Sequence, residues 1–176
     1  MRSSSCAIDS SCVIALDHAR LVPWLSVLFT RVLVPKSVRK ELFKRRVTKD
    51  RLQAIFGDYA FFERCDGYDQ GAVDILLMER HRRGFRDRGE VETVVQASQF
   101  GAPAIIDDLW GRHLAERFGL DCHGTLWVLE RLYDMRLVSS SQLRESLRIM
   151  RDLGIRLPWD VVDSLLARIG EQPLSV

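Results

Sequence analysis

The sequence predicts an α/β fold with a mostly parallel central sheet, flanked by helices and followed by a C-terminal helical extension. Short apolar runs alternate along the chain with amphipathic segments at helical spacing, which is typical of this class. The length of 176 residues suits one compact domain with a short extension. Apolar residues make up 47% of the chain, which is enough for a buried core.

Four short apolar runs are predicted as strands. They are residues 6–8, 32–34, 59–64 and 104–106. The first ends at Asp9 and the last ends at Asp107 and Asp108, while Pro35 follows the second. Apolar runs this short, bounded by polar or helix-starting residues, fit buried strands of a parallel sheet.

Helices are predicted where apolar residues recur three and four positions apart. Ser10 and Ser11 are expected to cap the first helix, Pro35 suits the first turn of another, and Gly119 is a natural C-terminal stop. The predicted helical ranges are 12–16, 23–29, 35–42, 72–81, 90–99, 110–118, 126–137, 142–153 and 159–169. We expect a domain over residues 5–137 and a helical extension over 138–172.

The composition argues against a membrane protein. The longest apolar stretch, residues 21–35, contains polar residues and Arg31, and is shorter than the ~18–20 residues that span a bilayer. Asp9 interrupts the apolar run that a signal peptide needs, so we expect a cytoplasmic protein without membrane contact. With 26 Lys and Arg against 24 Asp and Glu, the net charge of +2 neither favours nor excludes a nucleic-acid partner.

Four cysteines show no paired spacing. They are Cys6, Cys12, Cys65 and Cys122. In a chain without an export signal, this pattern predicts reduced and mostly buried thiols rather than disulfides.

Two of the predicted strands finish in aspartate, at Asp9 and at the pair Asp107–Asp108. In a parallel sheet the carboxyl ends of the strands lie at one edge, where ligands bind at the reversal of strand order. An aspartate at a strand end is also a common helix cap. Two such endings in one small sheet favour a site over capping alone.

Two glutamates fit the same edge of the sheet. Glu41 lies in the helix after the second strand, among basic neighbours that offer an alternative role in ion pairs. Glu90 and Glu92 open the helix at 90–99. At 100° per residue, Glu90 lies about 85° from the centre of the apolar face and Glu92 about 115°. Glu90 is therefore better placed to reach a cleft, although favourable interaction with the helix N-terminus is an alternative.

Carboxylates held close together repel one another, which a cation can relieve. Oxygen ligands select hard divalent ions such as Mg²⁺ or Mn²⁺. Such an ion can activate water and offset charge on a phosphoryl centre. Two basic segments, 36–51 and 80–88, could then hold a phosphate backbone, unless they are simply solvated faces.

The ordered set of these motifs resembles the PIN-domain family. The motifs are Ile8-Asp9-Ser10-Ser11, Val34-Pro35 through Glu41-Leu42, Gly89-Glu90-Val91-Glu92, Ile105-Ile106-Asp107-Asp108, Gly119-Leu120 and Gly124-Thr125-Leu126. They cover residues 6–130 in the order that the family shows. The Gly-Glu-x-Glu helix and the helical tail resemble a prokaryotic PIN-like subfamily.

The resemblance implies a three-layer sandwich and a metal-dependent ribonuclease that cuts single-stranded or structured RNA. Asp9, Glu41, Glu90 and Asp107 would be the catalytic, Mg²⁺- or Mn²⁺-binding carboxylates, and Ser11 would hydrogen-bond beside Asp9 at the substrate. In-line attack by water would leave a 5′-phosphate and a 3′-hydroxyl. Similarity to VapC-type toxins further implies a cognate antitoxin and a homodimer.

Three alternatives stay open at this point. Asp108 competes with Asp107 for one position, and Glu92 competes with Glu90. The chain is also longer than a minimal toxin, which bears on the toxin role more than on the nuclease role. A PIN-fold module that binds RNA or protein without turnover is the alternative function.

Overall fold

The computed structural model describes residues 3–44, 56–57, 59–82 and 88–174. Its centre is a parallel sheet in the order β3-β2-β1-β4-β5. The strands are β1 (Ser3–Ile8), β2 (Phe29–Val34), β3 (Phe62–Arg64), β4 (Ala104–Ile105) and β5 (Cys122–His123). Strand order reverses at β1, which pairs with β2 on one side and β4 on the other. This reversal is the place where parallel sheets bind ligands.

The strands are buried on both faces, and alternate residues enter two different cores. On β1, Cys6 and Ile8 belong to one apolar cluster, whereas Ala7 belongs to the other. On β4, Ile105 joins the first cluster and Ala104 the second. Since side chains alternate across a strand, the sheet must be covered by helices on both sides.

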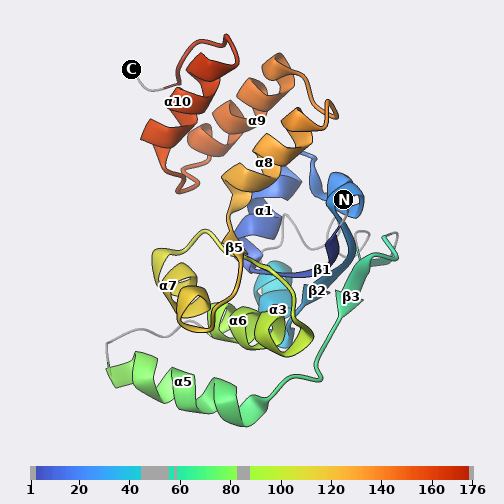
Figure 1. Cartoon of the computed structure of the whole chain (residues 1–176), viewed down its shortest axis with the longest axis vertical. Coiled ribbons are helices and arrows are strands. Elements are labelled where there is room, and N and C mark those ends of the chain that lie inside the picture. Colours follow the sequence, from blue (N-terminus) through green and yellow to red (C-terminus); the bar gives the residue numbers. More distant parts are fainter. Residues whose placement is uncertain (1–2, 45–55, 58, 83–87, 175–176) are drawn as a thin grey trace.

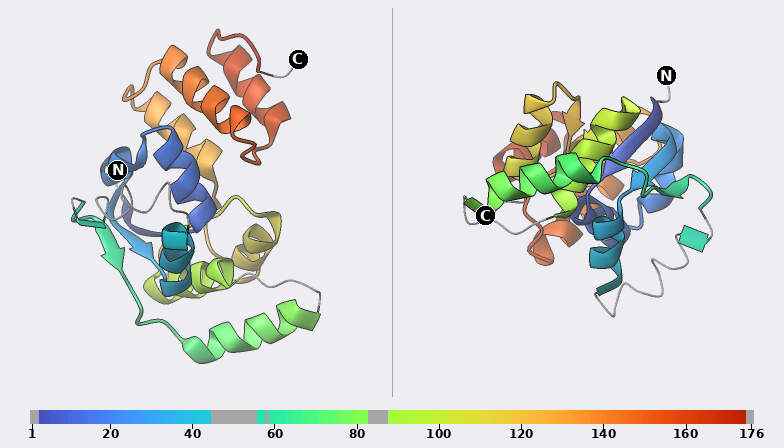
Figure 2. Two further views of the ribbon diagram at one scale, coloured as in Figure 1. Left: turned by 180° about the vertical axis from the view of Figure 1, so that it is seen from behind. Right: turned by 90° about the horizontal axis from the view of Figure 1, so that it is seen from below.

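Helices form the two outer layers (Figures 1 and 2). The first cluster includes residues of α1 (Ser10–His18), η1 (Val22–Trp24), α2 (Leu25–Leu28), α3 (Lys36–Lys44), α8 (Thr125–Asp134), α9 (Ser140–Asp152) and α10 (Trp159–Arg168). The second includes residues of α5 (Gln70–Arg82), α6 (Gly89–Phe100) and α7 (Leu109–Arg117). The predicted α/β class with a parallel sheet flanked by helices is confirmed.

The C-terminal helices share the first core. Leu143, Leu147 and Met150 of α9 are fully buried in the cluster that also contains Ile8. Ser139 begins α9 with a capping box, in which its hydroxyl accepts from the backbone N–H of Gln142 and the Gln142 side chain accepts from the backbone N–H of Ser139. The division of the chain into 5–137 and 138–172 stays a prediction.

The structure differs from the predicted elements in three places. Residues 23–29 do not form one helix: a 3₁₀ turn and the four-residue α2 precede Phe29, which already belongs to β2. The cause is pairing with β1, since the register runs from Ser3 opposite Phe29 to Ala7 opposite Leu33. β5 was not predicted; it pairs in parallel with β4 although it is only two residues long. The predicted strand at 59–64 shortens to β3.

Within the described residues, no single helix has the length and apolar character to cross a bilayer. The pair Ser10–His18 and Val22–Leu28, bent by 117°, passes that test of length and composition when taken together.

Replacement of a buried leucine on α9 tests whether this helix belongs to the core. We expect Leu147→Ala to lower the free energy of unfolding by about 2–5 kcal/mol, because a cavity is left where the side chain is fully buried. Ile75→Ala on α5, where the side chain is 69% exposed, should change it by no more than about 0.5 kcal/mol. Urea unfolding measures both, and a loss below about 1 kcal/mol for Leu147→Ala would contradict the shared core.

Candidate acidic site

Asp9 lies at the carboxyl end of β1 and is the N-cap of α1. Its Oδ2 accepts hydrogen bonds from the backbone N–H of Ser11 at 3.1 Å and from the Ser11 hydroxyl at 2.6 Å. The prediction that Ser10 and Ser11 cap this helix was therefore wrong, because the helix already begins at Ser10 and Asp9 before it has the extended conformation that an N-cap needs. Ser11 therefore orients the buried Asp9 carboxylate.

Glu41 reaches Asp9 from α3. The Ser10 hydroxyl donates to Glu41 Oε2 at 2.6 Å. A Cβ atom added to Gly89 would lie 3.2 and 3.3 Å from the two Glu41 oxygens and 3.4 Å from Asp9 Oδ1. The absence of a side chain at Gly89 thus leaves space that both carboxylates face. This space adjoins the first turn of α6, where the helix dipole favours negative charge.

The adjacent residues Asp107 and Asp108 have different partners. Asp107 accepts from the backbone N–H of Thr125 at 2.7 Å and from its hydroxyl at 2.6 Å. Asp108 is the N-cap of α7 and accepts from the backbone N–H groups of Trp110 and Gly111. The structure thus joins Asp107 to the start of α8 and gives Asp108 a capping role in α7.

Glu90 is buried beside a cation. Arg80 Nη1 of α5 lies 2.5 Å from Glu90 Oε2, and both side chains are almost completely buried. The Arg80 guanidinium also lies over the ring of Trp110, 3.9 Å from its centroid, a favourable cation–π arrangement. The Glu90 carboxylate is therefore held by α5 and, through Arg80, by α7.

Glu92 faces away from Glu90 into a separate polar cluster. It accepts from the backbone N–H and the hydroxyl of Ser37, at 2.8 and 2.9 Å, and from Arg88 Nε at 2.7 Å. Burial alone would raise the pKa of Glu92, but Tyr68, Ser37 and Arg88 outweigh it and hold that pKa below its usual range. Glu92 thus links α6 to α3 as a buried carboxylate.

An open cleft of about 600 Å³ brings most of the predicted site residues together. Its lining combines acidic residues with apolar ones and comes from the residues that follow β1 and β4, from α1, α6 and α7, and from the connection between α9 and α10. The lining residues are Asp9, Ser10, Ser11, Ile14, Glu90, Asp107, Asp108, Leu109, Leu153, Gly154, Ile155 and Arg156. Glu41 and Glu92 are not among them.

The thiol of Cys12 provides a second sign that the strand-end aspartates converge. Cys12 is fully buried in α1. Burial raises its pKa well above the usual value, and the negative charges of Asp107 and Asp9 raise it further. Both carboxylates therefore act on one buried atom, although they lie almost a hundred positions apart in the chain. Cys6, Cys12 and Cys65 are buried and Cys122 is half-buried, all as free thiols.

The carboxylates supply the hard oxygen donors that Mg²⁺ or Mn²⁺ prefers. Among the described residues, however, no three His, Cys, Asp or Glu side chains are positioned to hold one metal ion. Asp9 and Glu41 fit such an ion best, because both face the space beside Gly89. Glu90 fits less well, since Arg80 already balances its charge.

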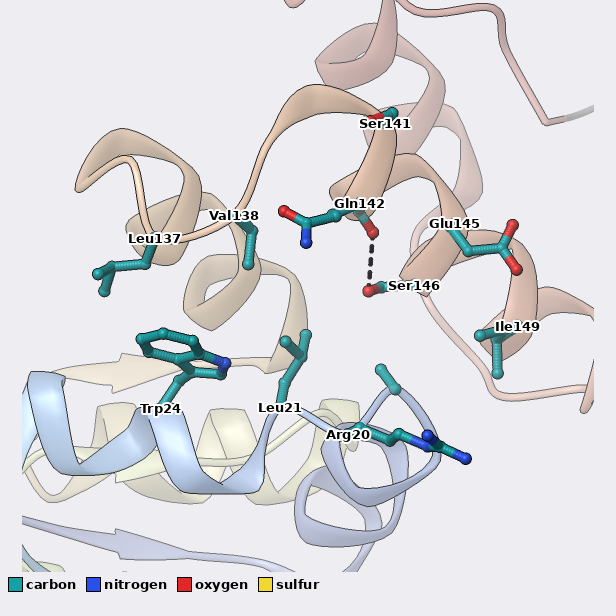
Figure 3. A pocket seen from close by; sticks show the side chains of 11 residues that line it. Arg20, Leu21, Trp24, Leu137, Val138, Ser141, Gln142, Glu145, Ser146 and Ile149 are labelled. Carbon is teal, nitrogen blue, oxygen red and sulfur yellow. Dashed lines mark hydrogen bonds between the residues drawn. The ribbon is translucent and has the colours of Figure 1, made fainter.

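A second hollow of about 390 Å³ lies between the corner after α1 and the start of α9 (Figure 3). Trp24 and Leu21 face Leu137, Val138 and Gln142 across it. None of the predicted carboxylates lines this hollow. The acidic cleft is therefore the better candidate for a functional site.

The two basic segments contribute less free charge than the sequence suggests. Arg39 forms a bidentate pair with Asp66, Arg80 pairs with Glu90, and Arg88 pairs with Glu92. Residues 45–51 and 83–87 of these segments lie outside the described residues. Arg39, Arg80 and Arg88 are therefore already paired with carboxylates within the fold.

Two residues of the site escaped the sequence analysis as functional groups. Thr125 appeared only within a family motif, and Arg80 only within the helix predicted at 72–81 and the basic segment 80–88. The signal for Arg80 was its position on the buried face of α5, next to Val73, Leu76 and Leu77. A buried cation needs a carboxylate partner, and that requirement could have pointed to Glu90.

The lowered pKa of Glu92 predicts a pH-dependent contribution to stability. This contribution is present above the unfolded pKa of about 4.3 and is lost as the pH falls through the lower folded value. At pH 7 we expect Glu92→Gln to lower the free energy of unfolding by about 1–3 kcal/mol. The difference from the unmodified protein should shrink between pH 5 and about pH 3.

Urea unfolding at several pH values measures this effect, with Glu116→Gln as the control, since Glu116 is largely exposed. A Glu92→Gln penalty that is equal at pH 7 and pH 3.5 would contradict a charged carboxylate at this position.

Comparison with known proteins identifies the family. The sequence matches DUF3368, described as a PIN domain, over residues 5–171. A comparison with curated proteins found no match. Among solved structures, the VapBC2 crystal structure from Rickettsia felis, bound to a DNA fragment from the promoter, is similar with a TM-score of 0.47 and 13% identity. The match covers 68% of this chain and 98% of that chain. Since the family match spans nearly the whole sequence, the chain belongs to the DUF3368 family of PIN domains.

Proposed function

We propose that the protein is a metal-dependent endoribonuclease whose catalytic carboxylates are Asp9, Glu41, Glu90 and Asp107. The observation that carries the proposal is the convergence of Asp9, Glu90 and Asp107 on one cleft at the reversal of strand order. Glu41 reaches Asp9 beside the same helix start. Packing alone does not require several acidic side chains in one place, because like charges repel.

Mg²⁺ or Mn²⁺ is the cofactor of this proposal. Asp9 and Glu41 would hold the ion, with Asp107 contributing from the end of β4. When bound, such an ion offsets the charge of the carboxylates and of the phosphodiester and lowers the pKa of water. The donor set contains only oxygen, which favours these ions over zinc.

The surrounding residues keep the acidic groups in place. The Ser11 and Thr125 hydroxyls each donate to an aspartate at 2.6 Å. These bonds restrict the rotation of Asp9 and Asp107, which stabilises one orientation of each carboxylate. Arg80 compensates Glu90 and lowers the total negative charge that an RNA phosphate meets. Ser11 also lines the cleft, where its hydroxyl would lie next to substrate.

The proposed partners follow from the resemblance to VapC-type toxins. They are an RNA substrate, a cognate antitoxin protein and a second copy of the chain, all in the cytoplasm. The family membership supports the nuclease part of this proposal more directly than the toxin part, since PIN domains share the fold beyond toxins.

One observation favours the alternative of an RNA- or protein-binding module without turnover. Every proposed catalytic carboxylate already has a donor within the fold, and Glu90 has a full ion pair. A protein that only binds RNA would retain this arrangement. The two functions differ in whether RNA is cut, which the first experiment below decides.

The proposed roles of the two adjacent aspartates can be separated by substitution. We expect Asp9→Asn and Asp107→Asn each to lower the rate of Mg²⁺- or Mn²⁺-dependent RNA cleavage by at least about 100-fold. Asp108→Asn should keep the rate within about threefold, because asparagine is an equally good N-cap for α7. Cleavage of an end-labelled single-stranded RNA measures all three.

The matched control is Asp134→Asn, which should cleave RNA as the unmodified protein does, since Asp134 is an exposed residue at the end of α8. Full cleavage by Asp9→Asn, with none in a mock purification, would refute the site. RNA binding by the unmodified protein without any cleavage would favour the binding module instead.

Metal binding should stabilise the folded protein. At a Mn²⁺ concentration of 100 times the dissociation constant, we expect a gain of about 2.7 kcal/mol in the free energy of unfolding. Asp9→Asn should lose most of this gain, whereas Asp134→Asn should retain it. Thermal unfolding with and without Mn²⁺ measures the effect, and equal shifts in the two variants would place the ion elsewhere.

A further inference from the structure

One wall of the acidic cleft comes from the connection between α9 and α10. Leu153, Gly154, Ile155 and Arg156 all line the cleft together with Asp9 and Asp107. They come from the end of the chain that the sequence analysis treated as an extension. The C-terminal helices therefore take part in the candidate site through this connection.

Arg156 is the only basic residue among the described residues that line the cleft. Its side chain is exposed. No hydrogen bond or ion pair joins it to another residue that the structure describes, unlike Arg39, Arg80 and Arg88. A cation that lines the same cleft as several carboxylates, without pairing with one of them, is available to an anionic ligand.

The cleft also presents apolar surface to solvent. Leu153 is 52% exposed, and Leu109 at the start of α7 is 68% exposed. Both line the cleft, as do the half-buried Ile14 and Ile155. Exposed apolar side chains beside a charged group can contact the faces of unpaired bases while the charge binds phosphate.

We propose that the α9–α10 connection is an RNA-binding wall, in which Arg156 binds a backbone phosphate next to the scissile one. Leu153 of this wall, together with Leu109 of α7, contacts the neighbouring base. This inference rests on the proposed nuclease function. The cleft volume of about 600 Å³ lies within the range of ~300–1,000 Å³ usual for ligand sites. The carboxylates of the cleft repel the phosphates of RNA, so RNA binding needs positive charge nearby. Arg156 supplies such a charge within the lining.

The test measures binding of a fluorescein-labelled single-stranded RNA by anisotropy, with Ca²⁺ in place of Mg²⁺ and with the integrity of the RNA checked on a gel. We expect Arg156→Gln to weaken binding about 3- to 10-fold and to reduce the slope of log K against log salt concentration by about 0.7, the value for one phosphate of a single strand. Arg156→Lys should retain the slope. Arg156→Glu should weaken binding further through repulsion.

The matched control is Arg136→Gln, an exposed arginine in the turn after α8 that does not line the cleft. It should bind RNA as the unmodified protein does. In cleavage assays Arg156→Gln should raise KM while kcat stays within about twofold, since Arg156 is placed at the rim and not at the reacting phosphate. Urea unfolding should show equal stability for both glutamine variants.

Equal affinity and equal salt slope for Arg156→Gln and the unmodified protein would overturn the inference alone. Tighter RNA binding by Arg156→Glu would also overturn it, because a negative charge at this position cannot favour a bound phosphate. If the unmodified protein neither binds nor cuts any RNA, the proposed function itself fails.

Discussion

Repulsion between carboxylates at one end of the parallel sheet is the constraint around which the site is arranged. Strand topology brings Asp9 and Asp107 to the same edge, and α3 and α6 add Glu41 and Glu90. The fold stabilises this charge locally, with a side-chain donor beside each group. The pairs are Ser11 with Asp9, Ser10 with Glu41, Thr125 with Asp107 and Arg80 with Glu90. Three of these donors are hydroxyls, which orient a carboxylate without removing its charge.

The two roles of a strand-end aspartate prove compatible in Asp9. Its Oδ2 caps α1, while its other oxygen, Oδ1, borders the space beside Gly89. The helix cap holds the second oxygen in a defined direction. At the other strand end the roles are divided between two residues, because Asp108 caps α7 and Asp107 bonds to Thr125. An aspartate pair after a strand can thus serve both a helix and a site.

Sequence patterns predicted the helices and strands whose apolar residues recur at a regular spacing, and also the residues at their ends. The strands around Ile8 and Ile105, and the acidic groups that follow, were found because burial and strand ends leave a local signal. β5 has two residues and no period, so its pairing with β4 could not be read from the chain. Arg156 could not be placed either, because its proximity to Asp9 depends on how α9 and α10 pack, not on any nearby pattern.

The packing of α9 explains why the wall of the cleft has a defined position. Leu147 and Met150 are fully buried against the core that also holds β1 and α1, so the end of α9 is fixed relative to the strand that carries Asp9. Leu153, the residue that follows α9, lines the cleft. A loop attached to a mobile appendage would not present Arg156 at a constant place, whereas one attached to the shared core can. The family match, which continues to residue 171, includes both helices of this arrangement.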